Sequence, residues 1–103
     1  MPEKKFGNFT VEVDENGYLV NMDDWSEELA KEIAKEVGIE LTDKHFKVIK
    51  FIREKIKNGE ALSIRKIGKS GIVSIKEFYQ LFPDGPLKKA SLIAGVPKPA
   101  GCV

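Results

Sequence analysis

The chain has 103 residues, of which 42% are hydrophobic and 32% are charged, and its formal net charge is +1. This length and composition predict one small domain with a single hydrophobic core. One cysteine and one histidine exclude an intramolecular disulfide framework and a cysteine-based zinc cluster, so we expect no metal and no cofactor. A membrane helix needs about 18 or more apolar residues, and neither such a run nor a signal-like apolar region follows the first residues. We therefore expect a cytoplasmic protein without membrane partners.

The charges are unevenly distributed along the chain. Residues 12–43 carry eleven acidic residues against two lysines, whereas residues 44–89 carry twelve basic residues against four acidic ones. Such an asymmetry predicts a dipolar surface, which is either only solvated or steers a partner toward one half of the molecule.

The N-terminal residues have a strand pattern. Phe9, Val11 and Val13 alternate with polar residues, and an Asn16-Gly17 pair supplies a turn before Tyr18. Alternation followed by an Asn-Gly turn is typical of a β-hairpin. The sequence therefore predicts a hairpin over residues 6–20, which must lie on the helices that follow because a lone hairpin is marginally stable.

Two longer amphipathic helices should follow the hairpin. The first is expected over residues 25–37, with Asp23 and Asp24 at its N-terminus and Gly38 as its end. The second is expected over residues 43–58, with Thr42 as its cap and Gly59 as its end. The second has two apolar edges, and we expect it to be the central helix. The apolar positions that define the two helices are Trp25, Leu29, Ile33 and Val37, then Phe46, Ile49, Ile52 and Ile56.

Three short helices and an arm complete the chain. Residues 62–68 and 74–81 read as helices separated by Ser70-Gly71, which gives a helix-turn-helix-like segment. A last helix begins at Pro86 and is stopped by Gly95. The fold class is therefore mainly α with a small β component: a helical bundle over 24–95, preceded by the hairpin and followed by an arm over 96–103.

The arm carries the only cysteine, Cys102, at the penultimate position. A lone cysteine is commonly a small buried apolar residue. Here, however, Pro97 and Pro99 exclude a helix and favour an extended spacer. We expect this spacer to reach outward and to leave the thiol accessible to another protein.

The last residues closely resemble the C-terminal signature of the DsrC/TusE family, which comprises dissimilatory sulfite reductase gamma subunits and sulfur-relay proteins of tRNA 2-thiolation. The resemblance rests on Leu81-Phe82-Pro83, Gly85-Pro86, Lys88, Ala90, Ile93-Ala94-Gly95, Pro97-Lys98-Pro99 and Gly101-Cys102-Val103. It implies an orthogonal helical bundle with a small hairpin, and a Cys102 that accepts and donates persulfide sulfur. Two cations are candidates for stabilising the thiolate: Lys98, which is near Cys102 in the sequence, and Arg65, which matches an arginine of the family pattern and would act if the arm folds back.

One departure from the family narrows this expectation. Dissimilatory members carry a second cysteine with ten residues between it and the penultimate one, and Ser91 occupies that position here. A serine cannot form the disulfide that those members use. The chain therefore resembles a single-cysteine relay protein, in tRNA thiolation or sulfur oxidation, more than a full sulfite-reduction cosubstrate. A gamma-type subunit or partner of sulfite reductase without the second redox cysteine remains the alternative.

The partners implied by the resemblance are an upstream sulfurtransferase and a downstream acceptor, either a tRNA thiolation enzyme or a sulfite reductase. Oxidation could also link two chains through Cys102. We expect a non-enzymatic carrier, because His45 sits one turn into a helix as a partly buried core histidine and no second nucleophile accompanies it.

Nucleic-acid binding by the helix-turn-helix-like segment is a third hypothesis. Against it, residues 74–81 carry a single base, Lys76, and four apolar residues that we expect in the core. These are Ile75, Phe78, Tyr79 and Leu81. We therefore do not expect direct DNA binding.

Overall fold

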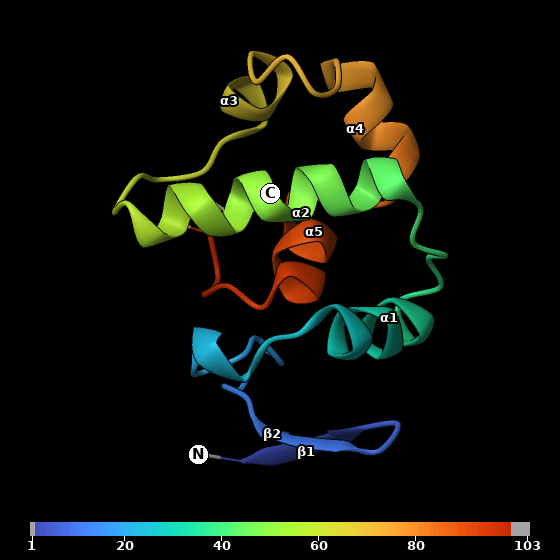
Figure 1. Cartoon of the computed structure of the whole chain (residues 1–103), viewed down its shortest axis with the longest axis vertical. Coiled ribbons are helices and arrows are strands. Elements are labelled where there is room, and N and C mark those ends of the chain that lie inside the picture. The colour runs from blue at the N-terminus through green and yellow to red at the C-terminus, as the bar shows by residue number, and fades with distance from the viewer. Residues whose placement is uncertain (1, 100–103) are drawn as a thin grey trace.

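Five α-helices, one short 3₁₀ turn and a two-stranded hairpin make up residues 2–99, the part of the chain that the computed structural model describes. In chain order they are β1 (Glu3–Phe6), β2 (Phe9–Glu12), η1 (Met22–Asp24), α1 (Glu27–Glu36), α2 (Asp43–Lys57), α3 (Ile64–Gly68), α4 (Ile75–Leu81) and α5 (Pro86–Ala94). The hairpin lies at one end, α3 and α4 lie at the other, and α2 and α5 lie between them (Figure 1). The predicted mainly helical fold is confirmed. Within residues 2–99 no helix is long and apolar enough to span a bilayer.

The hairpin forms earlier in the chain than its sequence pattern predicts. β1 and β2 pair antiparallel from Glu3 opposite Glu12 to Phe6 opposite Phe9, so the connecting turn is Gly7 and Asn8, with Gly7 at φ +58°. The predicted Asn16-Gly17 turn does form, but it closes only a single bridge between Val13 and Leu19. The error arose because both glycine-asparagine pairs are turn signals, and the charged strand β1 has no apolar alternation.

Helix α1 begins later than predicted. The Asn21 side chain accepts a hydrogen bond from the Asp23 amide and begins η1, and Ser26 rather than Asp23 or Asp24 caps α1 by accepting from the Leu29 amide at 3.1 Å. Trp25 stands between the two in an extended conformation. The predicted place of Trp25 on the apolar face of this helix is therefore wrong, and its side chain is free to reach α5.

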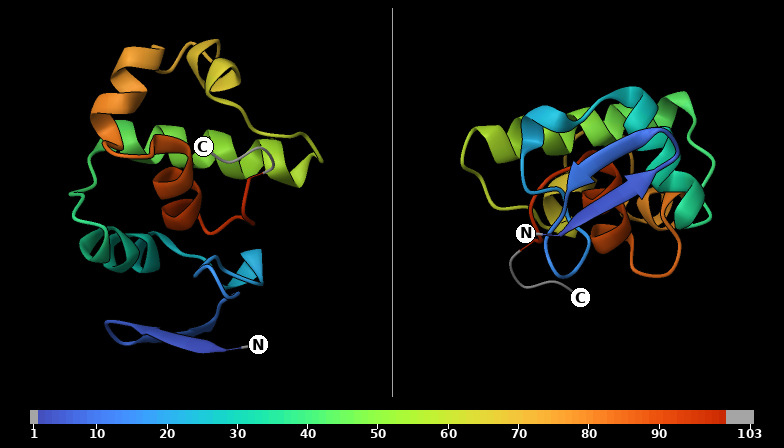
Figure 2. Two further views of the ribbon diagram at one scale, coloured as in Figure 1. Left: turned by 180° about the vertical axis from the view of Figure 1, so that it is seen from behind. Right: turned by 90° about the horizontal axis from the view of Figure 1, so that it is seen from below.

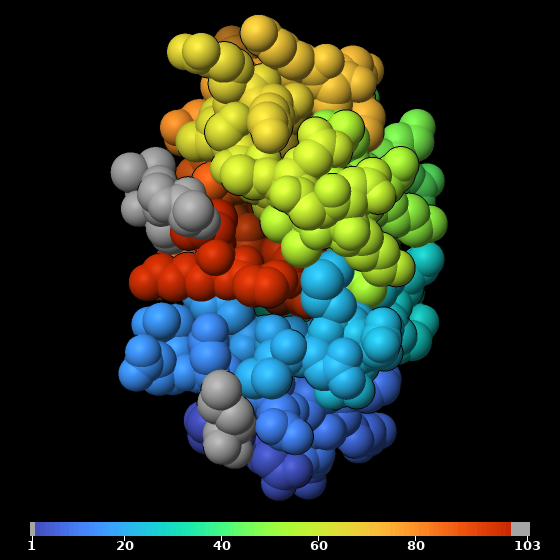
Figure 3. All heavy atoms as spheres, turned by 90° about the vertical axis from the view of Figure 1, so that its left-hand side faces the viewer, coloured from blue at the N-terminus to red at the C-terminus, as the bar shows by residue number. Residues whose placement is uncertain are grey.

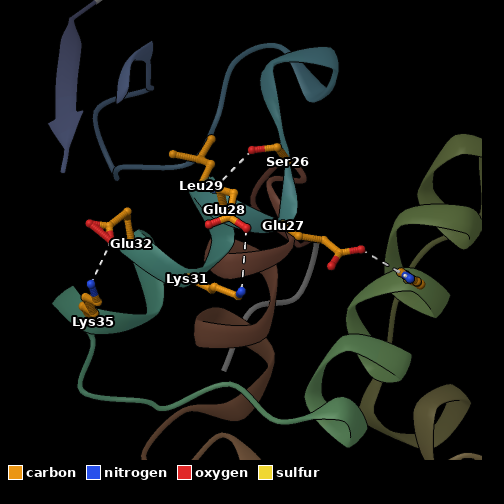
Figure 4. A network of polar contacts seen from close by, with 8 residues as sticks. Ser26, Glu27, Glu28, Leu29, Lys31, Glu32 and Lys35 are labelled. Carbon is orange, nitrogen blue, oxygen red and sulfur yellow. Dashed lines mark hydrogen bonds and ion pairs between the residues drawn. The ribbon is translucent and has the colours of Figure 1, made fainter. Parts of the chain in front are cut away.

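Exposed ion pairs line α1 and tie it to α2 (Figure 4). Within α1, Glu28 pairs with Lys31 at 3.7 Å and Glu32 with Lys35 at 3.0 Å. Glu27 reaches Lys50 of α2 at 3.5 Å. Each of these surface pairs contributes little by itself, and the pair between Glu27 and Lys50 joins the acidic part of the chain to the basic part.

The predicted helix over 43–58 is confirmed as α2, and His45 ties its start to α4. The His45 side chain is only 6% exposed, as expected for a core histidine. Its Nδ1 accepts from the Thr42 amide at 3.1 Å, and its Nε2 lies 2.8 Å from the Leu81 carbonyl oxygen. Because an amide can only donate, Nε2 must carry the hydrogen and donate to Leu81.

Helix α5, rather than α2 as predicted, is the helix on which most of the others pack. It contacts α1, α2 and α4, and it is enclosed between α1 and α2 in the views of Figures 1 and 2. Its small residues Ala90, Ser91 and Ala94 are completely or almost completely buried, and small side chains allow neighbouring helices to approach closely. The position of α5 matters because the C-terminal segment leaves from its end.

The predicted short helices are confirmed, but α4 is less buried than its apolar residues suggest. Phe78 is fully buried, whereas Ile75 is 46% and Tyr79 is 48% exposed. Ile75 and Tyr79 are four positions apart and so lie on the same side of this helix of seven residues, which leaves both side chains about half exposed although Ile75 also lies against Gly68 of α3. The expectation that all four apolar residues of this segment are core is therefore wrong for Ile75 and Tyr79.

We predict that His45→Leu lowers the free energy of unfolding by about 2 kcal/mol, because it leaves the Thr42 amide and the Leu81 carbonyl unsatisfied. His45→Gln should cost less, since glutamine at this helix position can still accept from the cap amide. Urea unfolding followed by circular dichroism measures both, with the exposed Lys47→Ala as the control. A leucine variant as stable as the wild type would contradict this account.

Candidate functional site

The structure describes three of the four residues predicted for the site, and these three lie on different parts of the fold. Cys102, the expected persulfide carrier, lies outside the described residues. Lys98 is exposed near the end of the described chain, Arg65 is exposed on α3, and Ser91 is buried in α5. The structure therefore describes the base of the segment that carries Cys102 and the groups that hold this base.

The C-terminal segment begins with a sharp reversal at Gly95. Gly95 has φ +67°, and its amide and that of Val96 donate back to the Leu92 and Ser91 carbonyls, each at 3.3 Å. Residues 96–99 then run back beside α5 (Figures 1 and 2). A left-handed residue at a helix end favours glycine because a side chain there is strained.

The four residues after Gly95 lie on the body of the molecule instead of reaching away from it. Val96 and Pro99 are buried, whereas Pro97 and Lys98 are exposed. These residues form a band between the N-terminal part of the chain and the residues of α2 and the following loop (Figure 3). The expectation of an outward spacer is therefore wrong for residues 96–99: proline does prevent a helix, but two apolar residues bring the extended chain onto the core.

Gly95 also lies close against side chains from the N-terminal part of the chain. A Cβ atom added at Gly95 would lie 2.5 Å from Cδ1 of Trp25 and 3.0 Å from Cδ2 of Leu19. Glycine is thus required here both for its positive φ and for the space that Trp25 occupies.

Two side chains from distant parts of the chain satisfy the last carbonyls of α5. Trp25 Nε1 donates to the Ile93 carbonyl at 2.8 Å, and Arg53 Nη1 donates to the Ala94 carbonyl at 2.8 Å. Arg53 Nη2 also donates to the Met22 carbonyl at 3.0 Å. The guanidinium carbon lies 4.3 Å from the centre of the Trp25 ring, at cation–π distance. We call Trp25, Arg53 and Gly95 the arm anchor.

Burial lowers the pKa of the Arg53 guanidinium, and the carboxylate of Asp23 partly opposes this effect. Arginine remains charged nevertheless, so its positive charge lies at the negative end of the α5 dipole, where cations are stabilising. This role of Arg53 was not predicted from the sequence. Its spacing indicates only that it lies beside the apolar face of α2, because Arg53 follows Ile49 by four positions.

Lys98 shares a hollow of about 220 Å³ with Asn16, Tyr18 and Lys88. Two ammonium groups at one hollow favour an anion or a carboxylate-bearing partner. Arg65, the other predicted thiolate-stabilising residue, does not line this hollow and has an exposed side chain on α3. The structure thus groups Lys98 with Lys88 and not with Arg65.

Ser91, at the position of the second family cysteine, is sealed within the core. The residue is 0% exposed, and its Oγ has no hydrogen-bond partner among residues 2–99. Its carbonyl accepts the Val96 amide, so Ser91 lies under the start of the arm. A buried hydroxyl without a hydrogen-bond partner has a desolvation cost, so the Ser91 hydroxyl should lower the stability of the fold.

Comparison with known proteins identifies the family. A family model described as DsrC like protein matches residues 5–103. The chain belongs to the DsrC/TusE family. It is 40% identical over 105 residues, and over the full length of both chains, to the gamma subunit of dissimilatory-type sulfite reductase from Nitratidesulfovibrio vulgaris. It is also 46% identical over 101 residues to sulfurtransferase TusE from Buchnera aphidicola, covering 90% of this chain and 89% of that one.

The fold agrees with solved DsrC structures. The oxidized gamma subunit of the dissimilatory sulfite reductase (DsrC) from Archaeoglobus fulgidus is 38% identical and superposes with a TM-score of 0.80, covering 99% of this chain and 100% of that one. The family predicted from the sequence is therefore confirmed. Since identity to the gamma subunit and to TusE is similar, the comparisons do not separate the two branches of the DsrC/TusE family.

We predict that Ser91→Ala raises the free energy of unfolding by about 1 kcal/mol, because it removes a buried hydroxyl without a described partner. The same change at Ser74, whose Oγ accepts the Glu77 amide and caps α4, should lower it by about 1 kcal/mol. Chemical unfolding of both variants gives the signs. Destabilisation by Ser91→Ala would show that this hydroxyl has a partner that stabilises the fold.

A second prediction concerns the reversal of the chain. Gly95→Ala should lower the free energy of unfolding by about 3 kcal/mol or more, because backbone strain adds to overlap with Trp25. Gly38→Ala is the matched control: it has φ +77° and nothing within 4 Å of an added Cβ, so it should cost only about 1 kcal/mol. If Gly95→Ala and Gly38→Ala lower the free energy of unfolding equally, an added Cβ at Gly95 does not overlap with Trp25.

Proposed function

We propose that this protein is a non-enzymatic sulfur carrier that accepts sulfane sulfur on Cys102 as a persulfide and passes it to an acceptor. The observation that carries the proposal is the DsrC family match, which extends through the C-terminal residues to 103 and includes the only thiol of the chain. The names of the relatives, TusE sulfurtransferase and DsrC-type gamma subunit, agree with it. They give no support to the alternative of DNA binding.

The chemistry needs only one thiol. The Cys102 thiolate attacks the terminal sulfur of a persulfide on the donor, the donor's sulfur–sulfur bond breaks, and the donor thiolate leaves. Cys102 then carries the persulfide. In the second step a nucleophile of the acceptor attacks the terminal sulfur, and Cys102 leaves as a thiolate. One sulfur atom moves in each step, and no outside oxidant or reductant is consumed.

Lys98 is the better candidate for the thiolate-stabilising residue. It is four positions from Cys102 in the sequence, its side chain is exposed, and it shares its hollow with Lys88. A nearby cation favours the anionic form of a thiol. Arg65 lies on a different element, α3, and does not line the hollow that Lys98 shares with Lys88. We therefore rank Arg65 second as a thiolate-stabilising residue.

Ser91 favours the single-cysteine relay over the gamma-subunit role. With one cysteine the chain cannot close an intramolecular disulfide, and the buried hydroxyl of Ser91 cannot take the place of a thiol in that redox step. Oxidation can therefore join Cys102 only to another molecule, including a second copy of this chain. The alternative is a partner of sulfite reductase without the second redox cysteine, and the relative from Nitratidesulfovibrio vulgaris supports it.

The proposed partners follow from the transfer chemistry. A sulfurtransferase would load Cys102, and a tRNA thiolation enzyme or a sulfite reductase would unload it. A persulfide carrier needs a reduced thiol before loading, so we place the protein in the cytoplasm, a reducing compartment.

We predict that incubation with a sulfurtransferase and thiosulfate adds the mass of one sulfur atom to the wild-type protein, reversibly by reductant. Cys102→Ser should add none, because the chain has no other thiol. Ser91→Ala should load as the wild type does, because it keeps Cys102. This variant controls for a general effect of substitution near the C-terminus. Intact-protein mass spectrometry measures all three, and sulfur on the Cys102→Ser variant would refute the proposal.

A further inference from the structure

The arm anchor joins three segments that are distant in the sequence. Trp25 comes from the loop before α1 and Arg53 comes from α2, and both donate to the end of α5, at Ile93 and Ala94. These are the last two residues of the helix before the chain reverses. Carbonyls in the last turn of a helix have no partner within the helix, and here two of them are satisfied by side chains instead of water.

The anchor fixes direction as well as position. A planar guanidinium holds its donors in a rigid fork, and Arg53 uses two of them on carbonyls of different segments, Ala94 and Met22. The Trp25 ring stacks on that guanidinium and also fills the space beside Gly95. The end of α5 can therefore neither rotate nor tilt without breaking a hydrogen bond or moving the ring into Gly95.

Stability alone does not account for this choice of residues. Partial burial lowers the pKa of the Arg53 guanidinium, and apolar residues of similar volume commonly stabilise a fold as well as a charge withdrawn from water does. A charged fork and an indole N–H aimed at two successive carbonyls instead specify one orientation for the chain that follows.

We propose that Trp25 and Arg53 are positioning residues for sulfur transfer: by holding the last two carbonyls of α5, they set the direction in which the segment carrying Cys102 leaves the body. This inference rests on the proposed function. The two residues act through residues 93–99, whose start they hold by hydrogen bonds to Ile93 and Ala94. Their loss should impair delivery of the thiol to a protein partner and leave its intrinsic reactivity unchanged.

Two conservative variants test the anchor. Trp25→Phe keeps an aromatic ring but removes the N–H that binds the Ile93 carbonyl. Arg53→Lys keeps the charge but cannot bind two carbonyls and stack on Trp25 at once. Ser74→Ala is the matched control, because it removes the cap of α4 and lowers stability without touching the anchor.

The first measurement is amide hydrogen exchange at Gly95 and Val96, whose amides donate to the Leu92 and Ser91 carbonyls. In both anchor variants these amides should exchange on the order of tenfold faster relative to the other amides of α5, whereas the Ser74→Ala control should change all of them together. Unchanged exchange in the anchor variants would overturn the claim that Trp25 and Arg53 hold this segment.

The second measurement compares two sulfur sources. With a sulfurtransferase preloaded from thiosulfate, the rate of persulfide formation on Cys102 should fall on the order of tenfold in both anchor variants, as expected for a misplaced reacting group. With inorganic polysulfide it should stay within about twofold of the wild-type rate, since a small donor needs no particular arm direction. The Ser74→Ala control should load normally from both sources.

The outcomes separate the inference from the proposed function. If the wild type loads from the sulfurtransferase and the anchor variants load equally fast, the positioning role is wrong. Equal slowing with both sources would also overturn it, because the defect would then lie in the thiol itself. If the wild type loads from neither source, it is the proposed carrier function that fails.

Discussion

The structure depends on how the last turn of α5 is held. Helix ends leave carbonyls without partners, and here Trp25 and Arg53 each donate to one of them at 2.8 Å. Their contact with each other and with the left-handed Gly95 requires the loop before α1, the middle of α2 and the end of α5 to meet at one place. The rest of the fold, with α5 enclosed by α1, α2 and α4, brings these three segments together.

This constraint fixes where the C-terminal segment starts on the body of the molecule. Proline alone would make residues 96–99 an extended spacer, but Val96 and Pro99 are buried, so the spacer starts from a fixed place on the body. Lys98 remains exposed and faces a hollow shared with Lys88. A carrier must present one atom to two different partners, and a fixed base limits the volume that the arm must search, which raises its effective concentration at a docked partner.

Local signals in the sequence predicted most of the helices, because caps and stops are short-range effects. Thr42, Pro86 and Gly95 each mark a helix terminus as expected. The errors have a common origin, since at Trp25 and at the hairpin two local signals competed, and the spacing of apolar residues did not distinguish between them. The anchoring role of Arg53 could not be predicted, because it requires knowing that α2 passes the end of α5. Family membership, by contrast, was predictable from the C-terminal motif, although Cys102 itself lies outside the described residues.

A carrier of this kind holds the start of its C-terminal segment in place and exchanges one sulfur atom at Cys102. Transfer of that sulfur from Cys102 to an acceptor protein tests this most directly. The wild-type protein would first be loaded to one persulfide per chain, then freed of donor and mixed with an excess of a reduced, unloaded sulfurtransferase, which can serve as the acceptor because thiolate–persulfide exchange runs in both directions. The account predicts that sulfur appears on the acceptor as it leaves Cys102, atom for atom, with the free thiol regained and no reductant needed. Sulfur that stays on Cys102, or leaves only when reductant is added, would contradict the carrier role.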